Sequence, residues 1–242
     1  MNGSPAIPVV TGAQMAAVDR AMADVCGLDL LQVMEIAGRA VAIAVRHLQP
    51  CGSVAVLCGS GGNGGDGFVC ARYLAGWGYS VRCWLSKPDT DLRGLAAHNM
   101  RICQKLGISI SSSEIPIDLS TADLIVDGLF GFGLSAAPSG RAAELIEAAN
   151  RASSSVFAID IPSGIDATTG ASLGHAIVAR TTVTLGLPKS GLLRGRGPAH
   201  AGEVIVADIG IPQKAFVSVG IPLTDRFLRS EFLHLDGTPV SF

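Results

Sequence analysis

The sequence predicts a single α/β domain with a mostly parallel central sheet. Three observations predict it: the chain is apolar enough to form a large core, short apolar runs alternate with helical stretches, and several runs end in glycines or polar residues. The chain has 242 residues, of which 48% are hydrophobic. A chain of this length can bury most of its apolar surface. Alternating strands and helices are typical of a parallel sheet covered on both faces.

The first part of the chain predicts two helices. Within residues 11–48, apolar side chains recur at three- and four-residue spacing, which is the period of one helical face. Pro50 marks the end of this helical pair. Residues 54–58 then form a short apolar run followed by glycines. Such a run is typical of a buried parallel strand.

The alternation continues through most of the chain. Further strands are expected at residues 79–85, 108–110, 124–126, 156–159, 182–185 and 204–206, and the clearest helices at residues 68–75, 92–106 and 141–149. No repeat, low-complexity tract or charge block divides the chain. We therefore expect residues 1–10 to be a flexible N-terminus, residues 11–221 to be one α/β domain and residues 222–242 to be a C-terminal tail.

Composition restricts the classes of partner. Lys and Arg total 18 against 20 Asp and Glu, a net charge of -2, so there is no broad basic surface for nucleic acid or an anionic membrane. The six cysteines show no CxxC pair, which favours free thiols in a reducing compartment. The first ten residues lack the pattern of a signal peptide, and no apolar run is long enough to cross a bilayer. We expect a soluble cytoplasmic protein.

The strongest motif is a glycine-dense turn, Gly-Ser-Gly-Gly-Asn-Gly-Gly-Asp-Gly at residues 59–67, which leads from the first strand into a helix. Glycines allow close approach of a ligand, and the N–H groups at a helix N-terminus favour a phosphate. A tight corner also needs glycine for steric reasons alone. Asp66 is either a direct ligand contact or the N-cap of the helix, and the sequence leaves both interpretations open.

Comparison with two nucleotide-binding motifs narrows the function of this turn. It has glycine spacing like that of the dinucleotide fingerprint, but no clear acidic residue ends the second strand. It also lacks the Lys-Ser/Thr pair of a Walker A loop. A dinucleotide-dependent oxidoreductase therefore has only the glycine spacing in its favour.

Two more strands end in polar loops, at Asp127-Gly-Leu-Phe-Gly-Phe-Gly and at Asp160-Ile-Pro-Ser-Gly. Because ligands of open α/β sheets bind outside the carboxyl ends of the strands, these loops should converge with the glycine-rich turn. One Asp at a strand end is more often a turn residue, but three polar ends indicate a shared site. Asn63, Asp127 and Ser163 offer oxygen atoms that suit a monovalent or alkaline-earth cation.

The remaining candidates are weaker. Lys189 follows another predicted strand and either meets the negative charge of a ligand or is solvated, with the second interpretation slightly favoured. The five histidines lack the spacing of a metal site or of a base beside a nucleophile.

The ordered motifs at residues 59–67, 127–131, 160–164 and 187–189 resemble those of the NAD(P)H-hydrate epimerases, the YjeF amino-terminal domain family. The resemblance covers about residues 11–212. It implies a Rossmann-like three-layer α/β/α sandwich and an isomerase that interconverts the (R) and (S) forms of hydrated NADH or NADPH, for repair of nicotinamide nucleotides. It also implies a bound potassium ion and a homodimer.

Residue roles follow from the resemblance by position. It implies that Asn63, Asp127 and Ser163 hold potassium. It further implies that Asp160 as first choice, and Asp66 as second, moves protons on and off the hydroxyl group of the hydrated carbon. The residues expected to contact the substrate are Gly62, Asn63, Gly64, Gly65, Asp66, Gly131, Phe132, Gly133, Leu134, Ser135, Ala136, Ala137 and Asp160.

Two positions depart from the family pattern. Gly62 replaces one of the two asparagines usual in the turn, and Ser135, Ala136 and Ala137 stand near the place where many members carry a basic residue. These losses weaken ligand contacts rather than the fold. They favour the alternative of a non-catalytic member that binds a nucleotide or metabolite. No segment resembling the kinase-like dehydratase is present, so we expect a separate dehydratase as pathway partner.

Overall fold

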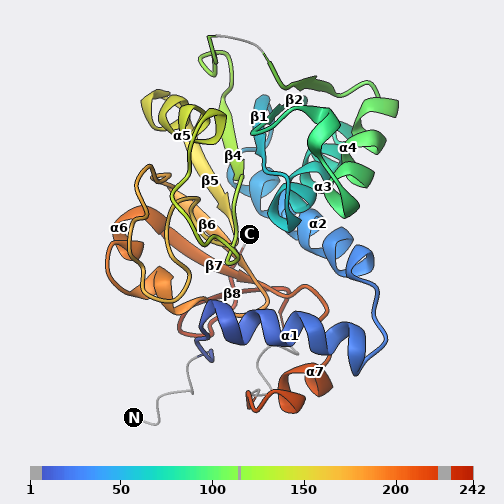
Figure 1. Ribbon diagram of the computed structural model, residues 1–242, viewed down its shortest axis with the longest axis vertical. Helices are drawn as coiled ribbons and strands as arrows, with labels where there is room; N and C mark the ends of the chain where they lie inside the picture. Colours follow the sequence, from blue (N-terminus) through green and yellow to red (C-terminus); the bar gives the residue numbers. More distant parts are fainter. Residues whose placement is uncertain (1–6, 114–115, 223–229, 242) are drawn as a thin grey trace.

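The computed structural model describes residues 7–113, 116–222 and 230–241. Its helices surround one sheet (Figure 1). The strands are β1 (Ser53–Cys58), β2 (Ser80–Leu85), β3 (Ser109–Ser111), β4 (Leu124–Gly128), β5 (Ser155–Ile159), β6 (Thr181–Leu185), β7 (Glu203–Ala207) and β8 (Phe232–His234). The α-helices are α1 (Gly12–Asp24), α2 (Leu30–Leu48), α3 (Gly62–Gly76), α4 (Gly94–Lys105), α5 (Arg141–Arg151), α6 (Gly197–Ala201) and α7 (Gln213–Ser218).

The sheet has eight strands in the order β3-β2-β1-β4-β5-β6-β7-β8. Strands β1 to β7 pair in parallel, and β8 joins the edge antiparallel to β7. The direction in which successive strands are added reverses between β1 and β4. In open α/β sheets a crevice forms at such a reversal, outside the carboxyl ends of the two strands.

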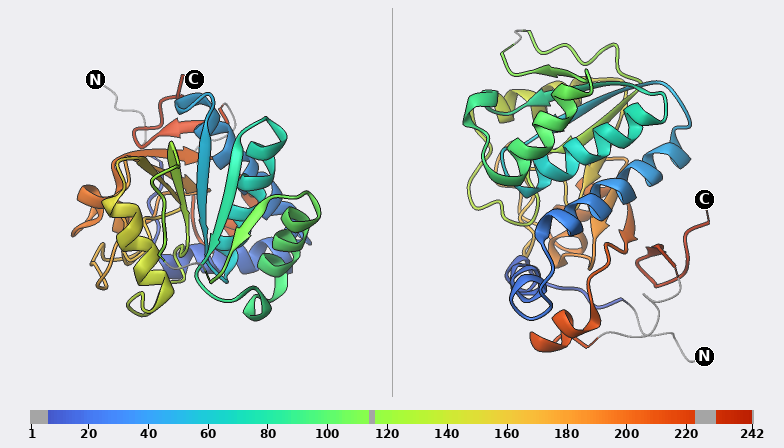
Figure 2. Two further views of the ribbon diagram at one scale, coloured as in Figure 1. Left: turned by 90° about the horizontal axis from the view of Figure 1, so that it is seen from above. Right: turned by 90° about the vertical axis from the view of Figure 1, so that its right-hand side faces the viewer.

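Helices cover both faces of the sheet, as predicted. Helices α2, α3 and α4 lie on one side and α5 on the other (Figure 2). Alternate residues of β1 supply the two cores: Val54, Val56 and Cys58 belong to the larger cluster, whereas Ala55 and Leu57 belong to the cluster that α5 covers. This period of two follows from the pleat of a strand. The three-layer α/β/α prediction is confirmed.

Several boundaries differ from the expected ones. Helix α3 begins at Gly62 instead of residue 68, because the glycines of the turn already adopt helical geometry. The short strand β8 was not expected, since three residues carry too little pattern to be recognised. Residues 7–10 pack onto the domain, with Ile7 and Val10 buried, and residues 1–6 lie outside the described residues.

Two further expectations concern the cysteines and the membrane. All six cysteines are free, and Cys58, Cys70, Cys83 and Cys103 are buried, as expected for thiols inside a core. Within the described residues, no helix combines the length and the apolar character needed to cross a bilayer.

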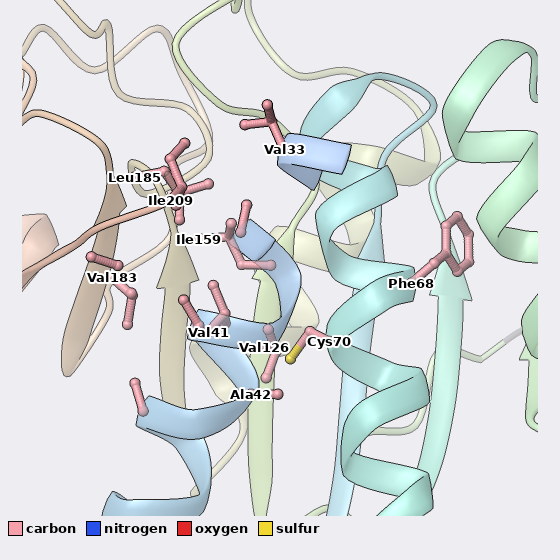
Figure 3. Close-up of a cluster of buried hydrophobic side chains, with 14 of the residues drawn as sticks. Val33, Val41, Ala42, Phe68, Cys70, Val126, Ile159, Val183, Leu185 and Ile209 are labelled. Carbon is pink, nitrogen blue, oxygen red and sulfur yellow. The ribbon is translucent and has the colours of Figure 1, made fainter. Parts of the chain in front are cut away.

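Glycine lets α2 and α3 approach each other closely. A Cβ atom at Gly38 of α2 would lie 2.5 Å from Cβ of Val69 and 2.7 Å from the carbonyl oxygen of Asp66, both in α3. No methyl group fits at these distances. Figure 3 shows side chains of these two helices, among them Val41, Phe68 and Cys70, in the core beside the sheet. The Gly38 contact therefore fixes where α3, and with it Asp66, sits relative to α2.

We expect Gly38→Ala to lower the free energy of unfolding by about 1–3 kcal/mol, the usual cost of overpacking a core. Urea unfolding followed by circular dichroism measures it. Gly76→Ala is the matched control, because a Cβ at that helical glycine meets nothing within 4 Å. A Gly38→Ala protein with the unfolding midpoint of the parent would contradict the tight helix contact.

Candidate active site

The glycine-rich turn joins β1 to α3 and packs against the end of β4. A Cβ at Gly59 would lie 1.8 Å from the carbonyl oxygen of Leu129, and one at Gly64 would lie 1.9 Å from that of Gly59. Only glycine allows these contacts. The N-cap of α3 is Gly61, and no side chain caps the helix. The N-cap interpretation of Asp66 is therefore wrong, because Asp66 lies inside the helix, one turn further on.

Asp127 is the last residue but one of β4, in a fully buried position. Its carboxylate accepts hydrogen bonds from the backbone N–H and the hydroxyl of Ser163, at 2.8 and 2.7 Å, and from the N–H of Leu129 at 3.2 Å. Ser163 Oγ in turn accepts from the N–H of Phe130 at 2.9 Å. Burial raises the pKa of Asp127 to about 6, against the opposing effect of the Ser163 hydrogen bonds. These contacts tie the loop after β5 to the end of β4.

Asn63 projects its amide toward the loop after β4. A Cβ at Gly131 would lie 3.1 Å from Asn63 Oδ1 and 3.3 Å from Asp160 Oδ2, so the amide and the carboxylate flank the same point. Within the part of the chain that the structure describes, the buried Asn63 Nδ2 has no hydrogen-bond partner. An unpaired donor at this depth is costly, and a bound ligand that accepts a hydrogen bond from Nδ2 would relieve that cost.

Asp160 and Lys189 form a buried ion pair that spans the ends of β5 and β6. Lys189 Nζ donates to Asp160 Oδ1 and to the carbonyl oxygen of Leu185, the latter at 2.7 Å. Asp160 Oδ1 also accepts from the N–H of Leu185 at 3.2 Å. Lys189 is only 1% exposed, so the slightly favoured interpretation of a solvated lysine is wrong. Burial of its long side chain is tolerated because each charge has a partner.

The backbone of Asp160 has an unusual conformation. Its φ is 69°, the only positive φ found for a non-glycine residue in the described part of the chain. Aspartate tolerates this left-handed region better than most residues do. The N–H of Asp160 donates to the carbonyl oxygen of Val183 at 2.8 Å, so the neighbouring strand holds the conformation in place. Such locally strained backbone is concentrated at functional sites.

Asn63, Asp160 and Lys189 meet in a pocket of about 740 Å³. One wall is apolar and comes from α1 and α2, and Leu185 and Ile209, both labelled in Figure 3, add to the apolar lining. The other wall is polar. The predicted substrate contacts that line the pocket are Gly62, Asn63, Asp66, Gly131, Phe132, Gly133, Leu134, Ser135, Ala136, Ala137 and Asp160.

The other predicted site residues lie outside this lining. Gly64 and Gly65 are packed against Gly59 and Met34, and they shape the turn. Asp127 and Ser163 are fully buried and hydrogen-bonded to each other at the strand ends.

Gly62 faces open space, since a Cβ there would meet nothing within 4 Å. The replacement of asparagine at this position therefore leaves room in the pocket and does not disturb the turn.

Sequence reasoning missed one site residue, Asp19 of α1, which also lines the pocket. The available signal was its spacing from Met15 and Met22, which places a carboxyl group on an apolar helix face. Burial raises the pKa of Asp19 to about 6, with Lys189 opposing and Asp160 adding to the rise. Burial, followed by the charges of Asp160 and Asp19, raises the pKa of Asp66 well above its usual value.

Three carboxyl groups and one ammonium group therefore share this pocket. Asp160 pairs with Lys189. Burial and two neighbouring carboxyl groups disfavour the charged form of Asp66 and raise its pKa. The arrangement can supply negative charge and an exchangeable proton inside a part-apolar pocket. That combination suits a reaction in which positive charge develops on a substrate.

Comparison with known proteins gives the family. The model of the YjeF-related protein N-terminus matches residues 30–191. The chain is 36% identical over 234 residues to the NAD(P)H-hydrate epimerase of Dehalogenimonas lykanthroporepellens, covering 94% of this chain and 91% of that protein. It is 38% identical to the epimerase of Limosilactobacillus fermentum, covering 82% of this chain and 95% of that protein.

Longer relatives and a solved structure agree. The chain is 41% identical to the bifunctional NAD(P)H-hydrate repair enzyme Nnr of Moorella thermoacetica, over 85% of this chain but only 41% of that enzyme. It thus spans about two fifths of the bifunctional relative. The crystal structure of yeast ynu0 superposes with a TM-score of 0.76 at 25% identity, covering 95% of this chain and all of that one. The chain belongs to the YjeF-related N-terminal family.

Proposed function

We propose that this protein is an NAD(P)H-hydrate epimerase, an isomerase that interconverts the (R) and (S) forms of hydrated NADH or NADPH. Two relatives of similar length bear the name of that enzyme. The observation that carries the proposal is the grouping of Asp160, Lys189, Asp66 and Asp19 in one pocket beside the glycine-rich turn. That grouping offers charge and protons to the nicotinamide ring of the substrate. The glycine-rich turn offers N–H groups to the phosphate groups of the same nucleotide.

The chemistry requires a carbon–oxygen bond to break and form again. Protonation of the hydroxyl on carbon 6 lets it leave as water, while the ring nitrogen supplies electrons and becomes part of a cation. Water then adds to either face and loses a proton. The ionised Asp160, fixed by Lys189 and Leu185, stabilises the cation in this scheme. The apolar wall of Met15, Met22 and Val33 limits access of bulk water to the ring.

Potassium fits the residues proposed to hold it. Asp127 is buried and receives hydrogen bonds from neutral groups only, so a cation nearby would balance its charge. Asn63, Asp127 and Ser163 would hold the ion with backbone carbonyl groups. No cluster of three or more His, Cys, Asp or Glu side chains able to hold a metal occurs in the described ranges. The bound ion would supply positive charge beside the buried Asp127 carboxylate.

The proposal also includes a homodimer, a cytoplasmic location and a dehydratase as pathway partner, all three taken from the family resemblance. The alternative of a non-catalytic binding member draws on Gly62 and Ala136, which line the pocket and lack the functional groups of many relatives. A binding protein would hold the hydrates without changing the rate at which they interconvert.

The first test is direct. We expect the protein to accelerate conversion of purified (R)-hydrate to an equilibrium mixture, measured by chromatography that separates the two forms, with NADH and NADPH hydrates assayed separately. A protein that binds the hydrates, as shown by calorimetry, yet leaves the uncatalysed rate unchanged would support the binding alternative and exclude the enzyme.

Asp160→Asn should slow epimerisation by about 10²–10³-fold, the usual cost of losing one charged or polar group that stabilises a transition state. Asparagine also tolerates the positive φ at this position. Asp66→Asn, which replaces a buried carboxyl group by an amide, serves as the comparison. If both variants convert the (R)-hydrate as fast as the parent, the assignment of catalytic carboxyl groups is wrong.

The ion pair gives a prediction of stability. Lys189→Met should lower the free energy of unfolding by about 3–5 kcal/mol, because it leaves Asp160 buried without a counter-charge. The double variant Asp160→Asn with Lys189→Met should unfold at a higher urea concentration than Lys189→Met alone, since no uncompensated charge remains. Equal midpoints for the single and double variants would show that the pair is not coupled.

Potassium should stabilise the protein. At a concentration of about 100 times its Kd, a specific ligand adds about 2.7 kcal/mol to the free energy of unfolding, so the thermal midpoint should rise in potassium chloride relative to choline chloride at equal ionic strength. Asp127→Asn should lose this response, whereas Asp118→Asn, a change at an exposed carboxyl group, should keep it. Identical midpoints of the parent protein in the two salts would refute the potassium site.

A further inference from the structure

Helix α1 brings one charged side chain into the pocket. Met15, Asp19 and Met22 line it, and their spacing of four and three residues places them on one helix face. Met15 and Met22 are 2% and 1% exposed, so Asp19 interrupts an apolar stripe. A structural role on this face would be served by another apolar residue. The Asp19 carboxyl group therefore points to a function in the pocket.

The same helix is attached to the loop that carries Lys189. The N–H of Val10 donates to the carbonyl oxygen of Pro188 at 3.0 Å, and the N–H of Ser190 donates to that of Val10 at 2.7 Å. The N–H of Gly12 donates to Thr168 Oγ1 at 3.1 Å. A capping box between Thr11 and Gln14 starts the helix just after this junction. These hydrogen bonds fix the position of α1, and with it Asp19, relative to the Lys189–Asp160 ion pair.

The other two carboxyl groups are poorly suited to exchange a proton. The Asp160 Oδ1 atom already accepts hydrogen bonds from Lys189 and from the N–H of Leu185, so this oxygen is engaged by protein donors. Asp66 is more deeply buried and lies beside two carboxyl groups, which together hold its proton tightly. Asp19 is half-buried and has neither a salt-bridge partner nor a hydrogen-bond donor among the described residues.

We infer that Asp19 is the general acid and base of this site, an assignment that rests on the proposed epimerase function. Its carboxyl proton passes to the hydroxyl on carbon 6, the carbon–oxygen bond breaks, water leaves, and the electron pair of the ring nitrogen forms the cation. Water then bonds to carbon 6 from either face, and its proton returns to Asp19. Asp160 keeps its negative charge throughout and stabilises the cation.

The charges around Asp19 agree with this role. Burial raises its pKa to about 6 with a contribution from Asp160, and Lys189 and Arg20 act in the opposite direction. Asp66 of α3 lies near enough to respond to the charge of Asp19, while α2 contributes apolar side chains to the same pocket. A group with a pKa near the working pH exchanges protons most effectively. Asp19 lies on α1, before residues 30–191, so the region matched by the family model does not include it.

The test compares Asp19→Asn, Asp19→Glu and the parent, using the full chain and purified (R)-hydrate of NADH from pH 5.5 to 8.5. The uncatalysed rate is subtracted at each pH. Because the acid form of Asp19 is required, the parent's kcat/KM should fall as the pH rises above about 6. Asp19→Asn should lower kcat by about 10²-fold, leave KM unchanged and remove this pH dependence. Asp19→Glu should restore part of kcat and the pH dependence.

Asp24→Asn is the matched control, since Asp24 is an exposed carboxyl group on the same helix, and it should behave as the parent. If the parent accelerates epimerisation but Asp19→Asn keeps its kcat and its pH dependence, or changes only KM, the assignment is overturned while the epimerase proposal stands. If the parent itself gives no acceleration, both fall. Should Asp19→Asn fail to fold, an Asp19→Glu profile without any shift along the pH axis would equally overturn the assignment.

Discussion

Lys189 and Asp160 form an ion pair with almost no contact with solvent, at 1% and 3% exposure. Removing two charges from water is costly, and the cost is offset only when each charge is fully bonded. Backbone groups of Leu185 supply the remaining hydrogen bonds, so the ends of β5 and β6 must stay in register. Burial raises the pKa of Asp19 and of Asp66; the charge of Asp160 adds to both rises, and the charge of Lys189 opposes them. The pair therefore acts on the pKa of both carboxyl groups.

The strands and their polar ends could be predicted because both leave strong local patterns. Short apolar runs specify buried parallel strands, and all the expected strands occur within one or two residues of their predicted bounds. The convergence of Asn63, Asp160 and Gly131 could also be predicted, because parallel strands present their carboxyl ends at one edge of the sheet. The sheet topology brings these residues together although they lie far apart in the sequence.

Other features could not be predicted because they depend on contacts between distant segments. The burial of Lys189 results from its pairing with Asp160, and nothing next to Lys189 in the sequence signals that partner. Asp19 looked like an ordinary polar residue, since an amphipathic helix contains many. Strand β8 is too short to carry a pattern and depends on pairing with β7. Asp66 could be read as an N-cap because the glycines before it hide the start of α3.

The backbone pairing of Val10 with Lys189 joins segments from the first tenth and the last quarter of the chain. A contact between such distant segments is made late, because a long loop must close before it forms. On the ribosome, Lys189 and its loop emerge only after six parallel strands, β1 to β6, have been synthesised. Until the Lys189 loop has been synthesised, the apolar face of α1 stays uncovered. Completion of the pocket therefore marks the end of folding, and a chain that has acquired this site has assembled nearly all of its sheet.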